Sequence, residues 1–551
     1  MIEPVEEPTS QEDYADTDPL KGAARVGRST LIMAVATTLS RITGFVRTWA
    51  LAFALGTTAA ASAYGTANDV PNMLFELIAG GILSSIFIPT FMDIRKKRGD
   101  EAAWRFAGNL MCLVTLILGT IALIGILFPQ PIMWTQYFLQ GDAGYSAELL
   151  ALASFFFRFF AIQVVFYGVG MIIQAVLNAQ RKYLWASLGP VFNNLVVIGF
   201  LLAAAYMPLD NRTFTIIGLG TSLGVLIMFL VMLPSLKKTG FKLYLGINLR
   251  DPELHRMIKL ALPMILYVVC NLVAVSVRNA TAASIGTDAQ AIVRFAIIWQ
   301  SLPYGIIAVS VSTALFTELS KAATEERMIA FKKTLVSGLR ITTLLMLPAS
   351  ALLFGLAEPL ISFYVAGRMS AENAAPIVNV LRVWTLSLGF FAAMMYLLRA
   401  FYALRDTWTP AIANFACTLV QVGGYLVLTG ALLPVAAFEV IGIPLADGLY
   451  FFLFFLTLLI LLRRKIGSFD IRQFIVVFAK MLVIAVLVGA TAFYGSQYLT
   501  YLLNPGRLMT VAIILICGLA GLIVTFVATR LLGVEEITSF TTKVKRKLFK
   551  Q

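Results

Sequence analysis

Long apolar stretches separated by short polar segments make up most of the chain from residue 29 onward. A helix needs about 20 apolar residues to cross the hydrocarbon core of a membrane, which is about 30 Å thick. By this criterion the pattern predicts an all-α integral membrane protein with about fourteen spans. Their approximate limits are 29–55, 62–92, 104–128, 148–178, 186–207, 214–236, 258–284, 289–318, 333–356, 375–402, 409–432, 438–462, 474–498 and 508–532.

Composition supports this fold class. Hydrophobic residues make up 59% of the 551 residues and charged residues 13%, whereas soluble domains have about 45–50% and about 25%. The four cysteines, Cys112, Cys270, Cys417 and Cys517, all lie in apolar runs, so no disulfide framework or metal-binding spacing is visible. The only histidine is His255. We therefore expect no metal site, no histidine proton relay and no cofactor.

Lysine and arginine are concentrated in alternate loops, which predicts the orientation because basic residues remain on the cytoplasmic side. The loops near 129–147, 208–213, 357–374, 433–437 and 499–507 hold only Arg212, Arg368 and Arg507 of the basic residues and should be exposed outside. Both termini are thus predicted to be cytoplasmic. The net charge of +14 is a topology signal that also attracts anionic lipids, and we expect no nucleic-acid partner. The basic loops contain Arg95, Lys96, Lys97, Arg98, Arg181, Lys182, Lys237, Lys238, Lys332, Lys333, Arg463, Arg464, Lys465, Lys543, Lys545, Arg546 and Lys547.

A faint internal repeat suggests two bundles of spans. The segment from Leu177 to Asn194 resembles that from Tyr402 to Phe415, because each joins two spans through a basic turn followed by an aromatic residue and a proline. Repeated bundles with a binding site between them are common in transporters. We predict an N-terminal tail (1–27), an N-lobe (28–237), a C-lobe (238–465), two further spans (466–535) and a basic tail (536–551).

Ionisable residues inside spans are candidates for function because each costs free energy unless it is paired or hydrated. Arginine dominates this set, and its planar guanidinium group matches phosphate oxygens. The arginines thus indicate an anionic, phosphorylated substrate, although structural pairing or snorkelling remains an alternative for each of them. The candidates for substrate binding are Arg41, Arg47, Arg278 and Arg294, those for gating or ion coupling are Asp69, Glu76 and Asp447, and Arg158 and Arg382 lie near the outer ends of their spans.

Asp69 and Glu76 are two helical turns apart, so they share one face of the second span. Arg41 and Arg47 point in different directions on an ideal helix, but a kink at Gly44 would let them converge. We therefore predict an acid and arginine cluster between the first two spans. Such a cluster can act as a gate that exchanges ion pairs within the protein for substrate phosphate.

Four segments carry a resemblance to a known family: SRITGFVRT from Ser40, VPNMLFELIAGGILSSIFIPTF from Val70, LPYGIIAVSVSTALFTELS from Leu302 and RAFYALRDTWTP from Arg399. The chain resembles the MurJ/MviN family of the MOP flippase superfamily over about residues 29–535. The resemblance implies fourteen spans, two six-span lobes, a groove for a polyprenyl tail at the last two spans, and export of lipid II for peptidoglycan synthesis. By position, Arg41 and Arg47 match the family's first-span arginines.

The chain departs from the family pattern at three places. Phe75 and Glu76 stand where many members have a basic pair, Ser62 stands where they have an acid, and Ile298 stands where they have a third arginine. Arg294 lies one turn before Ile298 on the same helical face. We therefore hypothesise that Arg294 has taken over the task of the missing arginine.

Three functions are compatible with these observations. The first is a lipid II flippase, and the second is an exporter of another lipid-linked oligosaccharide or amphiphilic solute. The third is a non-transporting scaffold for cell-wall synthesis proteins, which the intramembrane arginines disfavour. An enzyme is not expected, because the sequence lacks a nucleophile and base constellation and a nucleotide-binding motif. The membrane potential or a monovalent cation is the expected source of energy.

Overall fold

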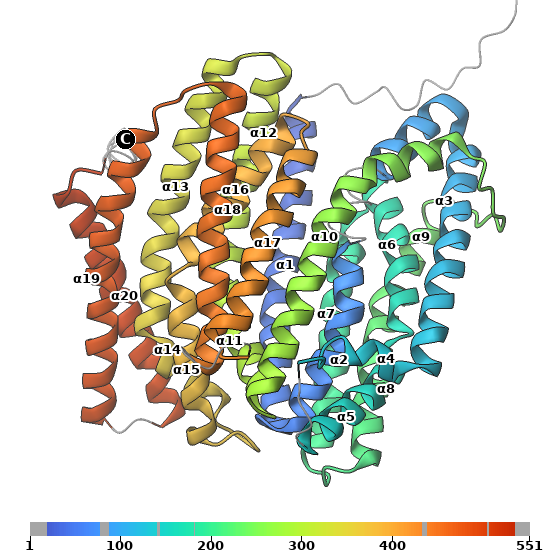
Figure 1. The fold of residues 1–551 in the computed structure, drawn as a ribbon. Helices are drawn as coiled ribbons and strands as arrows, with labels where there is room; N and C mark the ends of the chain where they lie inside the picture. The colour runs from blue at the N-terminus through green and yellow to red at the C-terminus, as the bar shows by residue number, and fades with distance from the viewer. Residues whose placement is uncertain are drawn as a thin grey trace, which may run out of the picture.

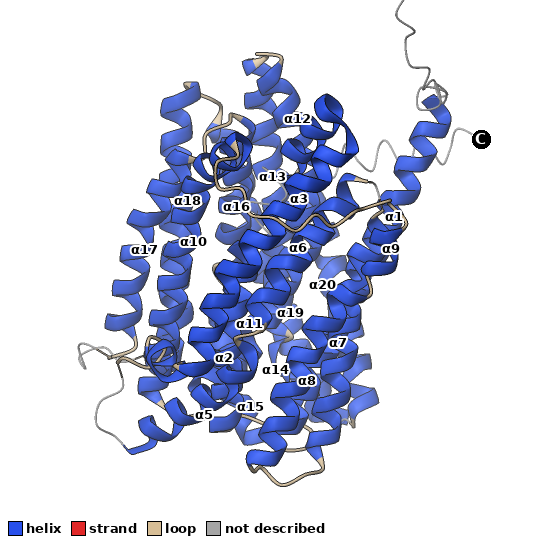
Figure 2. Cartoon of the chain, turned by 90° about the vertical axis from the view of Figure 1, so that its right-hand side faces the viewer, coloured by secondary structure: helices blue, strands red, loops and turns tan. Residues whose placement is uncertain are grey.

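The computed structural model describes residues 19–77, 87–139, 144–180, 182–431, 438–503 and 506–534. Helices account for nearly all of these residues, and no strand occurs among them (Figure 2). The N-terminal half comprises α1 (Pro19–Leu55), α2 (Ala59–Leu77), α3 (Ile88–Leu127), α4 (Pro129–Trp134), α5 (Gly144–Phe160), α6 (Gln163–Ala179), α7 (Tyr183–Ala205), α8 (Asn211–Leu230) and α9 (Leu233–Lys237). The C-terminal half comprises α10 (Pro252–Ile285), α11 (Ala289–Pro303), η2 (Tyr304–Ala308), α12 (Val309–Thr324), α13 (Met328–Gly355), α14 (Ala357–Ile361), η3 (Ser362–Tyr364), α15 (Ala371–Thr385), α16 (Leu388–Ala403), α17 (Trp408–Leu428), η5 (Glu439–Ile441), α18 (Gly442–Ile466), α19 (Ile471–Leu503) and α20 (Arg507–Leu531).

The two halves form neighbouring groups of helices, with α1 and α10 between them (Figure 1). In the N-terminal half α7 packs on α1 and α8, α3 packs on α6, and α2 packs on α5. In the C-terminal half α17 packs on α10 and α18, and α13 packs on α19. Contacts of α2 with α10 and α11 join the halves. The two-lobe division made from the sequence stays a prediction as far as its boundaries are concerned.

Eleven helical segments in the described residues are long and apolar enough to cross a membrane, or twelve if the bent pair α15 and α16 is one crossing. These segments correspond to the third through fourteenth predicted spans, so the total of fourteen is not confirmed. The first predicted span falls in α1, whose apolar run is interrupted by Arg41 and Arg47. The second runs through residues 78–86, which lie outside the described residues.

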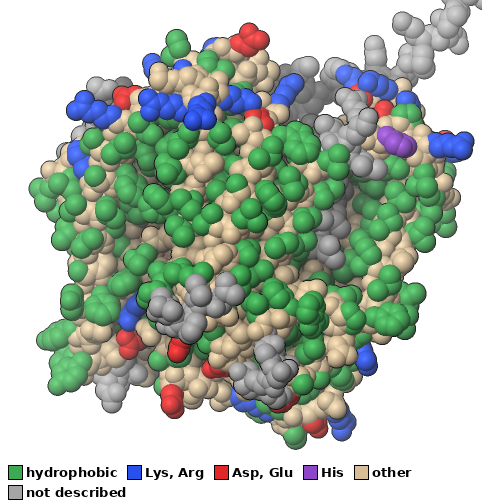
Figure 3. All heavy atoms as spheres, in the orientation of Figure 1, with side chains coloured by type: hydrophobic (Ala, Val, Ile, Leu, Met, Phe, Trp, Pro, Cys, Tyr) green, Lys and Arg blue, Asp and Glu red, His purple; other side chains and the backbone are tan. Residues whose placement is uncertain are grey.

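The start of α1 and the end of α20 lie at the same end of the bundle, the upper end in Figure 1. α1 begins at Pro19, inside the segment predicted to be a tail, while the basic tail 536–551 lies outside the described residues. On the face shown in Figure 3, most lysine and arginine side chains gather at the upper end, above a broad belt of hydrophobic side chains. This distribution is typical of a protein whose belt faces lipid.

Three interruptions shape the long helices. α3 breaks at Gly99, which has a φ of 82° directly after the basic residues Arg95 to Arg98. α11 ends at Pro303 and continues as the π-helical turn η2, since proline removes one backbone donor. α15 and α16 meet at a bend of 50°. A π-helical turn inside an α-helix often accompanies a functional site.

The turn between α16 and α17 is held by Asp406. Its Oδ1 accepts from the backbone N of Thr409 at 3.0 Å, and its Oδ2 accepts from Thr409 Oγ1 at 2.7 Å and from Lys465 Nζ at the end of α18. Partial burial acts to raise the pKa of Asp406, but the hydrogen bonds from Lys465 and Thr409 outweigh it and hold the pKa below its usual range. A depressed carboxyl pKa stabilises the fold above the unfolded-state pKa, and this contribution is lost as the pH falls through the folded-state value.

We predict that Asp406→Ala lowers the free energy of unfolding at pH 7 by about 1 kcal/mol, because the first turn of α17 loses its side-chain acceptor. Thermal denaturation in detergent would measure the loss. Asp93→Ala is the control, because Asp93 forms an exposed pair with Lys97 of the kind that contributes little. Equal stability losses in the two variants would contradict this role of Asp406.

Candidate functional site

An ion pair between the two halves lies at the centre of the site. Arg294 Nη2 on α11 is 2.6 Å from Asp69 Oδ2 on α2, and these side chains are 24% and 18% exposed. Asn279 Nδ2 on α10 approaches the same carboxylate oxygen at 3.5 Å. An ion pair in a membrane protein replaces the water that each charge would otherwise need. The pair therefore fixes α2 against α10 and α11.

Uncharged polar side chains extend this pair into a network. Gln290 Oε1 accepts from Thr66 Oγ1 at 2.9 Å and from the Tyr137 hydroxyl at 3.2 Å, and Gln290 Nε2 donates to the Asn279 carbonyl at 2.8 Å. Asn279 Nδ2 donates to Gln136 Oε1 at 3.1 Å. The interhalf network thus comprises Ser62, Thr66, Asp69, Gln136 and Tyr137 from the N-terminal half and Ser276, Asn279, Gln290 and Arg294 from the C-terminal half.

Gly65 on α2 allows Arg294 to reach the network. A Cβ atom built on Gly65 would lie 1.9 Å from Arg294 Nε and 2.6 Å from its Cζ. The guanidinium group therefore rests directly on the backbone of α2, one turn before Asp69. A larger residue at this position would require the guanidinium group to shift.

For Asp69, the predicted cluster between the first two spans is wrong. Asp69 pairs with Arg294 from the other half rather than with Arg41 or Arg47. Asp69 lies at the contact between the halves, next to α11. The spacing of residues along one helix cannot indicate a neighbour on a distant helix. The side chain of Glu76 lies outside the described residues.

Gln136 corrects the expectation that the 129–147 segment is an exposed loop. The segment begins with the short helix α4, and the Gln136 side chain is 2% exposed. Its amide donates to Ser276 Oγ at 2.6 Å. The lack of charge in this segment therefore reflects, in part, burial against α10.

A second contact joins the halves at the C-terminal end of α1. Arg368, in the loop before α15, donates through its Nη atoms to the carbonyls of Ala54 and Met207, the latter at 2.6 Å. Its backbone N donates to the Phe53 carbonyl at 3.1 Å. The last carbonyls of a helix lack intrahelical partners and carry partial negative charge. Arg368 thus caps α1 from the opposite half, and we call this contact the Arg368 clasp.

Arg41 reaches the opposite half without an acidic partner. Its side chain is exposed, and a Cβ atom on Gly305 in η2 would lie 3.2 Å from its Cζ. The charges of Arg41 and of Arg399 on α16 both act on the Tyr304 hydroxyl. Arg41 therefore lies close to η2 of the opposite half.

Arg399 is a functional candidate that the sequence reasoning did not list. It lies at the start of the RAFYALRDTWTP segment near a span end, where an arginine usually snorkels. In the structure it is partly exposed beside Tyr304 and Tyr402. The predicted span 375–402 contains Arg399, so listing every arginine up to the last residue of each span would have included it.

Arg47 lies near the end of α1 in the N-terminal half. It is partly exposed, and its charge acts on Tyr167, whose hydroxyl donates to Asn72 on α2 at 2.8 Å. Within the described part of the chain, no acidic group lies at ion-pair distance from Arg41, Arg47, Arg278 or Arg399. These arginines are thus available to an anion.

Asp447 lies in a separate cluster inside the C-terminal half. Its carboxylate accepts from Trp384 Nε1 at 2.9 Å, from Gln421 Nε2 at 2.8 Å and from the Tyr425 hydroxyl. Arg278 is close enough for its charge to act on Tyr425, and Arg278 Nε is buried without a hydrogen-bond partner. The structure therefore brings two sequence candidates together away from Asp69 and Arg294.

The remaining arginines differ in their surroundings. Arg382 stacks over the ring of Phe493 at 4.9 Å and lies 3.5 Å from Glu358, which supports a structural role. Arg158 is exposed on α5. Among the described residues, no group of three or more histidine, cysteine, aspartate or glutamate side chains is placed to hold a metal ion.

The fold and this site define a polytopic helical membrane transporter with arginines in both halves that have no acidic partner among the described residues. A family model described as lipid II flippase MurJ matches residues 51–540, and the chain belongs to this family. It is 26% identical to a probable lipid II flippase MurJ of Rhizobium meliloti (strain 1021), over 93% of this chain and 95% of that one.

Solved structures show the same fold. One titled "Lipid II flippase MurJ, inward closed conformation" has a TM-score of 0.73 at 23% identity and covers 91% of this chain and 99% of its own. An inward-facing multidrug resistance MATE family transporter of the MOP superfamily has a TM-score of 0.64 at 15% identity, over 79% of this chain and 98% of its own.

The close packing of Gly65 and Arg294 generates a prediction. Gly65→Ala should displace the guanidinium group and lower stability as Arg294→Ala does, on the order of 1–3 kcal/mol, because Asp69 loses its partner. Combining the two substitutions should add little, since both remove one contact. Thermal denaturation in detergent would measure all three variants.

Gly199→Ala on α7 is the matched control, because a Cβ atom there meets nothing within 4 Å. It should not lower stability, because alanine is a better helix former than glycine. Additive losses from Gly65→Ala and Arg294→Ala would show that the two residues act independently.

Proposed function

We propose that this chain moves lipid II, the undecaprenyl-diphosphate-linked peptidoglycan precursor, from the inner to the outer leaflet of the bacterial cytoplasmic membrane. Membership of the lipid II flippase MurJ family supports this function. The observation that carries it is the set of arginines without acidic partners in the described residues, Arg41 and Arg47 from one half and Arg278 and Arg399 from the other. Guanidinium groups bind phosphate oxygens through paired hydrogen bonds.

The mechanism we infer is alternating access between the two halves. The interhalf network and the Arg368 clasp hold the halves together toward the end opposite the basic residues (Figure 1). The head group enters from the other end and its diphosphate binds between the arginines of the two halves. Separation of the halves at the network, with closure at the basic end, then releases the head group on the far side while the polyprenyl tail remains in lipid.

Coupling to the membrane potential is part of this proposal. An anionic head group that moves outward from a negatively charged cytoplasm gains about 2.3 kcal/mol per elementary charge for each 100 mV. Asp447 accepts three hydrogen bonds and Asp69 has an ion pair with Arg294, so both carboxylates already have partners in this conformation. A monovalent cation at either carboxylate would have to compete with these donors.

We predict that Arg41→Ala, Arg47→Ala and Arg399→Ala each lower lipid II transport about tenfold or more, since a hydrogen bond to a charged group contributes about 1.5–3 kcal/mol. The measurement is flipping of fluorescent lipid II in proteoliposomes, together with complementation of a flippase-depleted strain. Lysine at each position should restore transport only in part, because the paired geometry is lost.

Arg472→Ala serves as the control, since Arg472 is exposed at the start of α19. Another lipid-linked sugar and a fluorescent phospholipid, assayed in parallel, test the substrate. Transport of the other lipid-linked sugar at the lipid II rate would favour the broader exporter, and full activity of the three alanine variants would remove these arginines from the substrate site.

The proposed direction requires the basic end to be cytoplasmic. In a background with Cys112, Cys270, Cys417 and Cys517 replaced, Asn211→Cys should react with an impermeant thiol reagent on intact cells. Lys96→Cys should react only after permeabilisation. Both positions are exposed in the structure. The reverse labelling pattern would overturn the orientation and with it the direction of transport.

A further inference from the structure

An extended segment joins the two halves across the outside of α3. Residues 241–250, which we call the strap, connect α9 to α10 without helical or strand structure until the turn that begins at Leu249. Figure 2 shows this loop crossing the helices of the N-terminal half nearly at right angles. In both views it lies on the outer side of the bundle (Figures 1 and 2).

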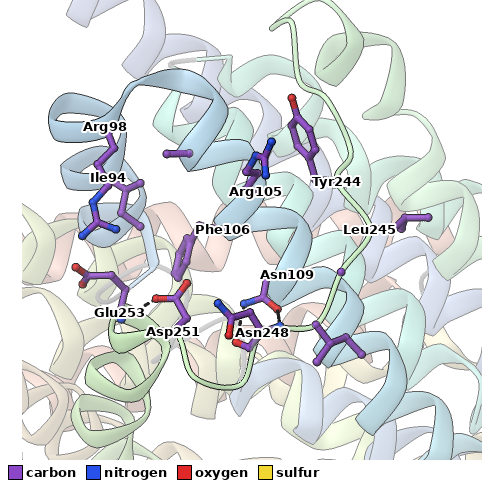
Figure 4. A pocket seen from close by; sticks show the side chains of 13 residues that line it. Ile94, Arg98, Arg105, Phe106, Asn109, Tyr244, Leu245, Asn248, Asp251 and Glu253 are labelled. Atoms are coloured by element: carbon purple, nitrogen blue, oxygen red, sulfur yellow. Dashed lines mark hydrogen bonds between the residues drawn. The ribbon is translucent and has the colours of Figure 1, made fainter.

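Specific contacts attach the strap to α3. Asn109 Oδ1 accepts from the backbone N of Asn248 at 2.7 Å, and Asn109 Nδ2 donates to the Asn248 carbonyl at 3.1 Å (Figure 4). This pair of bonds imitates the pairing of two strands. The Asn109 side chain is 8% exposed, so the amide is held in place for this contact.

Aromatic groups and a glycine complete the attachment. Trp104 packs edge-on against Phe241 with ring centroids 5.2 Å apart, and Arg105 lies 5.0 Å from the ring of Tyr244. A Cβ atom on Gly108 would be 2.2 Å from the Tyr244 carbonyl oxygen. The surface of α3 is thus shaped to receive the backbone of the strap.

Alternate residues of the strap carry large apolar side chains that the protein does not cover. Leu243, Leu245, Ile247 and Leu249 are 55%, 80%, 50% and 60% exposed. In an extended chain, residues two apart point to the same side. The strap therefore has an apolar edge, with basic residues nearby at Lys237, Lys238, Lys242 and Arg250.

The backbone of the strap restricts where this apolar edge can lie. Among the described residues, the backbone groups of 241–247 have no hydrogen-bond partner outside the strap. Such groups need water, so an irregular segment cannot lie within the hydrocarbon core. The boundary between head groups and acyl chains provides water on one side and apolar surroundings on the other.

We propose that the strap is an interfacial anchor that lies in the leaflet at the basic end of the molecule, with its four apolar side chains among acyl chains. The strap contacts Arg105 and Asn109, which directly precede the apolar run of α3. The strap therefore lies at the level where α3 enters the hydrocarbon core. Its basic neighbours favour anionic phospholipids, which attract lysine and arginine at a membrane surface.

A cavity of about 450 Å³ lies between the strap and α3 at the same level. Arg98 and Arg105 line it from α3, and Asp251 and Glu253 line it from the start of α10 (Figure 4). Charges of both signs therefore face a space at the depth of the lipid head groups. This space accommodates the head group of a phospholipid whose chains contact the apolar edge.

Site-directed spin labelling of the full chain in phosphatidylethanolamine and phosphatidylglycerol vesicles tests the proposal. In the background without native cysteines, nitroxides at Leu245→Cys and Ile247→Cys should collide more with oxygen than with a water-soluble nickel chelate. A label at Lys242→Cys, on the opposite side of the strap, should show the reverse. If labels at 245 and 247 collided with the nickel chelate as often as the label at 242, the proposal that the strap is a membrane anchor would be wrong.

A second variant tests the attachment to α3. Asn109→Ala should increase the mobility of a label at Ile247→Cys, because the two hydrogen bonds to Asn248 are lost. Unchanged mobility would show that these bonds do not hold the strap. Both measurements require only that the protein resides in a membrane, so their outcome is independent of the substrate that it carries.

Discussion

The structure depends on one constraint, namely that an ionised side chain within a membrane needs a partner or water. Arg294 and Asp69 meet this need for each other, and in doing so they join helices from opposite halves. Nearby amides and hydroxyls follow the same rule, since Gln290 bonds to groups on both sides of the contact. The interface is therefore held by directional polar contacts that can be exchanged, rather than by apolar packing alone.

The arginines divide into two groups by the same criterion. Arg294 and Arg368 have partners in the opposite half, a carboxylate in one case and helix-terminal carbonyls in the other. Arg41 and Arg399 remain partly or fully exposed and have no acidic partner among the described residues. One group holds this conformation together, and the other is available to an anionic head group. An arginine count from sequence alone cannot distinguish these roles.

The sequence was sufficient to predict the fold class and most spans, because apolar length is a strong signal, while the arginine-based substrate site stays a prediction. It was insufficient for contacts between distant helices. Asp69 was predicted to face Arg41 and Arg47, yet its partner is Arg294, which is remote in sequence. Arg399 was omitted because it lies at a span end, and the uncharged segment around Gln136 hid a buried contact. Whether Arg294 replaces the arginine missing at Ile298 stays a hypothesis.

The contact between Gly65 and Arg294 should limit which residues can occur together at these positions during evolution. The guanidinium group occupies space that a side chain at position 65 would enter. A lineage that acquired a larger residue at 65 would have to place the arginine at 294 differently or neutralise Asp69 by other means. The identities of these three positions should therefore vary together among relatives, although 65 and 294 belong to different halves of the chain.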